Sequence, residues 1–176
     1  LNLVISPWLG LEAAEKLESK FGTPYLVYPG LPVGPIETSR FLRQVGKALD
    51  LPQKTLERAI DEETQEAYQF FGYIASALYM GFCNAPFAVV AESNIAIGLT
   101  RYLTNECGLL PMLVIVTDDP PAEHREVIRE RLTRELEGTI VPQVIFEHYT
   151  YLIHENLEKH HFLLLFASSM EKYLSA

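Results

Sequence analysis

Four short apolar runs alternate with helical stretches in the second half of the chain, and this rhythm constrains the fold more than any other feature. The runs are FAVVA, MLVIVT, VPQVIF and FLLLF, which begin near Phe87, Met112, Val141 and Phe162. Amphipathic stretches predicted to be helical separate them, at 95–107, 122–137 and about 150–159. Strands that are apolar at nearly every position are typical of parallel sheets covered by helices on both faces. The pattern therefore predicts an α/β fold with a Rossmann-like parallel sheet over residues 85–176.

The stretch 122–137 shows how such a helix would face the sheet. Its predicted buried stripe consists of Ile128, Leu132 and Leu136. Two pairs have the i,i+4 spacing of helical ion pairs, namely Glu130 with Arg134 and Arg131 with Glu135. We expect both pairs on the solvent-facing side of the helix.

The first half of the chain predicts a smaller unit that a long helix joins to this sheet. LNLVIS and PYLVY are predicted strands, and helical periodicity follows each of them, with Pro35 suited to the first turn of the second helix. No helix breaker occurs between Gln53 and Gly72, so we expect a long helix across roughly 53–81. The expected organisation is a βαβα piece at 1–50, a linking helix at 51–84 and the Rossmann-like unit at 85–176.

Composition and charge exclude several classes of protein. The 176 residues carry a formal net charge of −9, which argues against a nucleic-acid partner because phosphate binding needs concentrated Lys and Arg. No apolar run is long enough to span a membrane, and residues 1–11 do not resemble a signal peptide. The two cysteines, Cys83 and Cys107, do not make a disulfide framework. We therefore expect a cytoplasmic protein.

Polar residues follow each predicted strand, at the edge of a parallel sheet where ligands usually bind. These residues are Ser6, Glu92-Ser93-Asn94, Thr117-Asp118-Asp119, Glu147-His148 and Ser168-Ser169. Helix capping explains most of them: Ser93 or Asn94 would cap the helix from Ile95, and Ser168 or Ser169 a helix that contains Met170. Capping does not require Glu92, which leaves a ligand-binding role open for this corner.

Common catalytic and cofactor sites find no support in the residues. A dinucleotide site needs a glycine at the first strand–helix corner, whereas AESNIAIG offers only Gly98, well inside the helix. His154 and His161 would lie about 10 Å apart on a helix, too far to share one metal ion. Cys83 and Cys107 are each interpreted as small buried hydrophobic residues. No catalytic residue and no metal ligand is assigned, and the residues alone indicate an α/β ligand-binding scaffold.

The order of the segments resembles the nitrogenase component 1 family. The matching segments are LNLVIS through FGTPY, PVGPIETSRFL, a long helix, FAVVAESNIAIGLTRYL and finally FLLLFASSMEK. This family includes catalytic subunits, cofactor-assembly scaffolds and dark-operative protochlorophyllide reductase subunits, and its chains are considerably longer. The resemblance therefore implies a middle-to-C-terminal part of such a chain, and PVGPIETSRFL is most similar to β-type subunits or their scaffold relatives.

The resemblance also implies a cofactor cavity at the strand ends, because clusters in this family lie between Rossmann-like domains. One type of subunit has a cluster-ligating cysteine at the position of Ser6 and a loop around the cofactor at the position of Glu92, Ser93 and Asn94. These residues, together with Ser168, are expected to line the cavity. An iron–sulfur cluster or an iron–molybdenum-type cofactor is implied for the full-length complex. None is expected on this chain alone, since thiolates hold such clusters and Ser6 is not a usual ligand.

The function implied by the resemblance is that of part of an oxidoreductase subunit. It would support electron transfer to a small, cluster-bound substrate in nitrogen fixation. Its partners would be a paired component 1 subunit in a heterotetramer and an ATP-dependent iron protein reductase. Two alternatives stay open: a cofactor-assembly scaffold, and an α/β ligand-binding module without a redox role, since a fold alone does not fix a function.

Overall fold

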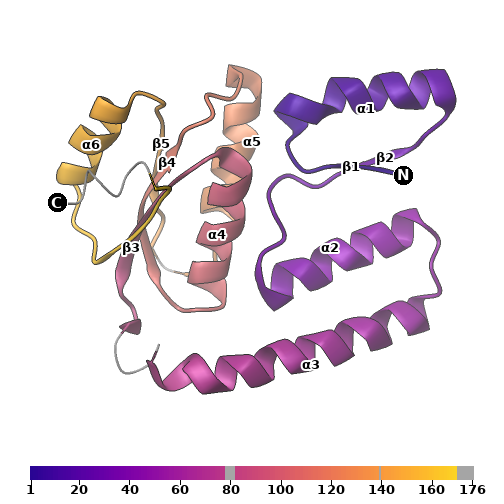
Figure 1. Ribbon diagram of the computed structural model, residues 1–176, viewed down its shortest axis with the longest axis horizontal. Coiled ribbons are helices and arrows are strands. Elements are labelled where there is room, and N and C mark those ends of the chain that lie inside the picture. The colour runs from indigo at the N-terminus through magenta and orange to yellow at the C-terminus, as the bar shows by residue number, and fades with distance from the viewer. Residues whose placement is uncertain (78–81, 139, 170–176) are drawn as a thin grey trace.

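The computed structural model describes residues 1–77, 82–138 and 140–169, and these form two separate parallel sheets with flanking helices (Figure 1). Both the α/β class and the Rossmann-like sheet predicted from the apolar runs are confirmed. The elements are β1 (Asn2–Val4), α1 (Pro7–Phe21), β2 (Tyr25–Val27), α2 (Gly34–Ala48), α3 (Gln53–Ala77), β3 (Pro86–Ala91), α4 (Ser93–Asn105), β4 (Leu110–Val116), α5 (Ala122–Thr133), β5 (Gln143–Phe146), α6 (Thr150–Glu158) and β6 (Leu164–Phe166).

The N-terminal unit comprises β1 to α3. Strands β1 and β2 pair in parallel with Asn2 opposite Tyr25, and α1 and α2 lie on opposite sides of this small sheet (Figure 1). Helix α1 ends at Gly22, whose φ of 66° is readily adopted by glycine and lets its N–H reach the carbonyl of Glu18.

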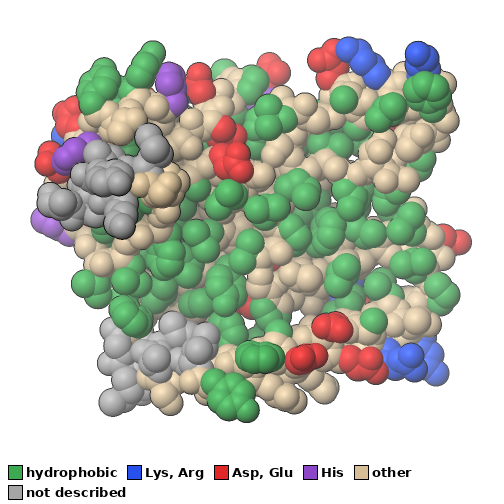
Figure 2. Space-filling view, in the orientation of Figure 1, with side chains coloured by type: hydrophobic (Ala, Val, Ile, Leu, Met, Phe, Trp, Pro, Cys, Tyr) green, Lys and Arg blue, Asp and Glu red, His purple; other side chains and the backbone are tan. Residues whose placement is uncertain are grey.

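Helix α3 runs alongside α2 and carries exposed acidic side chains along its middle (Figures 1 and 2). The long helix predicted for 53–81 is thus observed as far as Ala77, and residues 78–81 lie outside the described part of the chain. Within the described residues, no helix combines the length and apolar character needed to cross a bilayer.

The C-terminal unit contains a four-stranded sheet in the order β5-β4-β3-β6, and all its neighbouring strands are parallel. The central strands are buried on both faces because their side chains alternate between two cores. Phe87 and Val89 point to the face covered by α4 and α5, whereas Ala88 and Val90 point to the face covered by α6. Helices on both faces of one parallel sheet were predicted, and the prediction is confirmed.

A cluster of charged side chains joins the two units. Its members, which we call the ion cluster, are Glu37 and Arg40 on α2, Arg101 on α4, Arg131 on α5, and Glu135 just after α5. Arg101 Nη2 donates to Glu37 Oε1 at 2.6 Å, and Arg131 Nη2 lies 3.6 Å from Glu37 Oε2. The side chains of Arg101 and Glu37 are only 1% and 4% exposed, so the two charges depend on each other rather than on water.

The expectation that Arg131 and Glu135 face solvent is wrong for Arg131, whereas the Glu135 side chain is 39% exposed. They do form an ion pair, but the Arg131 side chain is only 15% exposed, and its Nε and Nη2 donate to the carbonyl of Pro29 at 3.2 and 3.1 Å. Burial raises the pKa of Glu135, but hydrogen bonds from Arg131 and Arg101 outweigh this effect and hold it below its ordinary value. The reason for the error is that α5 docks its last turn on the N-terminal unit, whereas the Glu130–Arg134 pair is exposed as expected.

Removing the buried carboxylate of Glu37 should destabilise the fold more than removing the buried cation of Arg101. Glu37→Gln leaves three arginines facing one carboxylate, whereas Arg101→Met leaves two charges of each sign. We expect Glu37→Gln to lower the free energy of unfolding by about 3–5 kcal/mol and Arg101→Met to lower it by less. Urea unfolding at neutral pH measures both values. The control is Arg134→Met, which removes an exposed pair and should change stability by no more than about 0.5 kcal/mol; equal effects of Glu37→Gln and this control would contradict the expectation.

Candidate functional site

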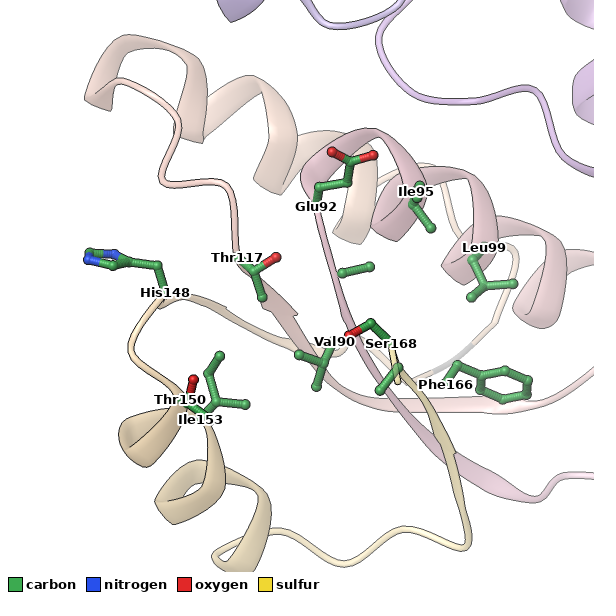
Figure 3. A pocket seen from close by; sticks show the side chains of 12 residues that line it. Val90, Glu92, Ile95, Leu99, Thr117, His148, Thr150, Ile153, Phe166 and Ser168 are labelled. Atoms are coloured by element: carbon green, nitrogen blue, oxygen red, sulfur yellow. The ribbon is translucent and has the colours of Figure 1, made fainter. Parts of the chain in front are cut away.

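A pocket of about 430 Å³ opens where the strands of the large sheet end (Figure 3). Its polar residues come from four successive strand ends or the turns after them, because parallel strands bring their carboxyl ends to one edge. They are Glu92, Thr117, His148, Thr150 and Ser168. Its apolar lining consists of Val90, Ala91, Ile95, Leu99, Ile153, Phe166 and Ala167. The pocket is therefore an apolar hollow with a polar rim.

The structure brings together only part of the predicted cavity lining. Glu92 and Ser168 line this pocket, whereas Ser93 is fully buried and Asn94, half-buried, accepts a hydrogen bond from the Leu31 N–H at its backbone carbonyl. Ser6 lines a different hollow of about 300 Å³ along β1 and α1. The expected convergence on one pocket thus holds for Glu92 and Ser168 and does not include Ser6. A cofactor contact at any of these residues stays a prediction.

Asp118 holds the start of α4, a role that the sequence did not reveal. The helix begins at Ser93, whose N–H donates to Asp118 Oδ1 at 2.9 Å and whose hydroxyl donates to Asp118 Oδ2. Trp8, in the first turn of α1, also donates to this carboxylate, and its Nε1 lies 3.1 Å from Asp118 Oδ2. Asn94 Oδ1 does accept the N–H of Ile95 at 3.1 Å, as expected of a cap. The expected start of the helix is corrected, because α4 begins earlier, at Ser93, and the N–H of Ser93 is bound by Asp118 from the end of the neighbouring strand.

The hydrogen bond between Asp118 and the Ser93 N–H limits what the start of α4 can bind. The first turn of a helix carries unpaired N–H groups and a partial positive charge, and in many α/β proteins it receives a phosphate. Here the carboxylate of Asp118 occupies that position. An internal anion thus replaces the external one, which agrees with the absence of the glycines that a dinucleotide site needs.

The opposite rim of the pocket is formed by His148 and its neighbours (Figure 3). His148 Nδ1 lies 4.0 Å from Asp119 Oδ2, and Asp119 also pairs with Arg125 at 2.6 Å. Glu147 Oε1 accepts the backbone N–H groups of His148 and Tyr149, each at 2.9 Å, just before α6. The turn that presents His148 is thereby fixed by its own sequence neighbours.

The donor atoms of the pocket do not fit an iron–sulfur cluster, which thiolates normally hold. Cys83 and Cys107 precede β3 and β4, so they lie at the amino edge of the sheet, opposite the pocket. Cys83 is exposed, which corrects its interpretation as a buried residue, and Cys107 is partly buried. In the described ranges, no three His, Cys, Asp or Glu side chains are placed to hold a metal ion together.

Neutralising Asp118 should loosen the junction between Trp8 and α4. In Asp118→Asn the side-chain amide presents a donor where Ser93 and Trp8 also donate, so we expect a loss of about 1–3 kcal/mol of stability. Trp8 is the only tryptophan in the chain, so its fluorescence spectrum reports this contact directly. The matched control is Asp119→Asn in the same loop, and an unchanged Trp8 emission in Asp118→Asn would contradict the assignment.

The two cysteines should differ in reactivity. Burial raises the pKa of the Cys107 thiol, although its hydrogen bond with Tyr102 acts in the opposite direction. Since the thiolate is the nucleophile, Cys107 should react with iodoacetamide about tenfold more slowly at pH 8 than exposed Cys83, and its rate should rise as the pH increases further. Cys83→Ser and Cys107→Ser isolate the two thiols. In urea their rates should converge, and a difference that persists there would assign the effect to local sequence instead.

Two curated proteins have sequences similar to that of this chain. One subunit of the light-independent protochlorophyllide reductase of Nostoc punctiforme is 29% identical over 110 residues, which are 61% of this chain and 21% of that protein. The corresponding subunit of Physcomitrium patens is 30% identical over 112 residues, which cover 61% of this chain and 22% of that protein. The chain thus matches only about a fifth of the length of these relatives.

The fold has a close counterpart among solved structures. The structure of nitrogenase Cp1 at pH 6.5 superposes on 98% of this chain with a TM-score of 0.73, at 19% sequence identity and over 35% of its own chain. At this identity the likeness establishes the fold. The sequence profile of the nitrogenase component 1 type oxidoreductases extends over residues 1–176, so the chain belongs to that family.

Proposed function

We propose that the chain is part of a reductase subunit of the component 1 type, in which it provides scaffold and interdomain surface for electron transfer to a small substrate. The observation that carries this proposal is the pocket at the carboxyl edge of the large sheet, in a chain that the family profile matches from end to end. A hollow with an apolar floor and a few polar groups is suited to positioning a small molecule.

The relatives favour a reductase over the alternatives. The curated matches are named subunits of light-independent protochlorophyllide reductase, which supports turnover of a substrate rather than storage of a cofactor precursor. Reduction of an organic substrate of this kind and reduction of dinitrogen are both compatible with the proposal. A cofactor-assembly scaffold and a ligand-binding module without redox chemistry are the competing functions that the purified protein can distinguish.

We further propose that the complete protein acts in the cytoplasm with a paired component 1 subunit and an ATP-dependent iron protein reductase. An iron–sulfur cluster or an iron–molybdenum-type cofactor would take its thiolate ligands from residues other than those that line the pocket described here. Glu92 and Ser168, which line the pocket, would border the substrate side of such a centre.

The test uses the complete protein that carries this chain, purified without oxygen from its host together with the proteins bound to it. Iron and acid-labile sulfide are quantified, and ATP-dependent reduction of protochlorophyllide and of acetylene is measured with an iron protein reductase. Iron together with ATP-dependent reduction supports the proposal. Iron that is passed to another protein without turnover indicates an assembly scaffold, and a protein without iron indicates a non-redox module; either result overturns the proposal.

A bulky residue in the pocket should block turnover without removing the metal. Ile95 lines the pocket and is 38% exposed, so Ile95→Trp can fill the space without disturbing the core. We expect at least about a tenfold loss of substrate reduction at unchanged iron content, because a displaced substrate no longer meets the reducing centre. The matched control is Val127→Trp, which alters a similarly exposed residue of α5 outside the pocket. Equal activity in both variants would contradict a role of the pocket in substrate reduction.

A further inference from the structure

We propose that the carboxyl-edge pocket binds an organic cation with an apolar body, such as an aromatic ring that carries an ammonium group. This inference goes beyond the proposed function: it names a class of ligand for the same pocket and does not require that ligand to be reduced. It depends on the shape of the pocket and on the sign of the charges around it. It also depends on the hydrogen bond by which Asp118 binds the N–H of Ser93 at the start of α4.

The floor of the pocket is suited to the apolar body of such a ligand. Val90, Ile153 and Phe166 come from different elements and line one hollow of about 430 Å³ (Figure 3). Ile95 and Leu99, one turn apart on α4, extend this lining. Covering these side chains with an apolar ligand removes their surface from water, which is the main source of affinity in such sites.

The charges around the pocket favour a cation. Glu92 contributes an exposed carboxylate at the α4 end of the pocket, and the described lining residues include no lysine or arginine. His148 lies at the α6 end, with its Nδ1 4.0 Å from the carboxylate of Asp119, which also pairs with Arg125. The hydroxyl groups of Thr117, Thr150 and Ser168 add polar contacts without adding charge.

An anion would lack its usual place in this pocket. The N–H of Ser93 at the start of α4, which would otherwise attract a phosphate or carboxylate, already donates to Asp118. Trp8 and the hydroxyl of Ser93 hold the same carboxylate in position, so an external anion would have to displace a group with three hydrogen bonds. An anionic ligand is therefore disfavoured by Asp118 as well as by Glu92.

The test compares three probes of nearly equal shape: 2-naphthylmethylammonium, 2-naphthylmethanol and 2-naphthoate. Each is titrated into the ¹⁵N-labelled chain, and amide shifts of Glu92, Thr117 and Ser168 locate the site and give the dissociation constants. We expect the ammonium probe to bind about fivefold more tightly than the alcohol, as one exposed charge pair contributes, and the carboxylate to bind most weakly. Added salt should bring the dissociation constants of the ammonium probe and the alcohol closer together, because it screens the charge pair.

Variants assign the preference to Glu92. In Glu92→Gln the ammonium and the alcohol should bind within about twofold of each other, because only the charge pair is lost. Glu123→Gln, which removes an exposed carboxylate of α5 outside the pocket, should leave the fivefold preference intact. Equal binding of ammonium and alcohol to the unaltered chain, tighter binding of the carboxylate, or amide shifts confined to other surfaces would each overturn the inference. Because no iron, nucleotide or reductant takes part, this result is independent of the reduction assay, and either proposal can fail while the other stands.

Discussion

The carboxylate of Glu37 is the point at which the two units of the molecule are held together. It lies on α2 and is buried against Arg101 of α4, and Arg131 of α5 approaches its second oxygen. A buried guanidinium without its carboxylate partner is strongly unfavourable, so α2 cannot shift relative to α4 without a large loss of stability. Further contacts between the units are the Leu31 N–H with the carbonyl of Asn94 and Trp8 Nε1 with Asp118.

Carboxylates distant in sequence also fix the starts of two helices. Asp118 accepts the N–H of Ser93 at the start of α4, across 25 residues, and Glu106 accepts the N–H of Ile36 in the first turn of α2, across 70 residues. Burial raises the pKa of Glu106, although the hydrogen bond from the Ile36 N–H acts in the opposite direction. In each case a helix that lacks a cap within its own sequence is completed by another element, so local structure depends on the tertiary fold.

The sequence predicted the elements far better than their contacts. Apolar runs such as FAVVA identify strands of a parallel sheet because such strands are buried on both faces, and the structure has the predicted neighbours in parallel. The spacing of Arg131 and Glu135 fits an exposed pair and a buried one equally well, so only the docking of α5 could decide between them. Likewise, Ser6 is polar at a strand end like Glu92, but its strand belongs to the other sheet, and its side chain lines another hollow.

Asp118 also limits how this fold could change in evolution. A nucleotide site at the start of α4 would require glycines in place of Glu92 or Ser93 and, in addition, the loss of Asp118. Removing Asp118 first leaves the start of the helix without its cap, whereas inserting glycine first places a flexible residue where the carboxylate still excludes phosphate. Neither intermediate has gained a ligand, and the one without Asp118 has also lost the carboxylate that binds the first N–H of the helix. Because of this internal carboxylate, a nucleotide site at the start of α4 in this chain would need at least two substitutions together.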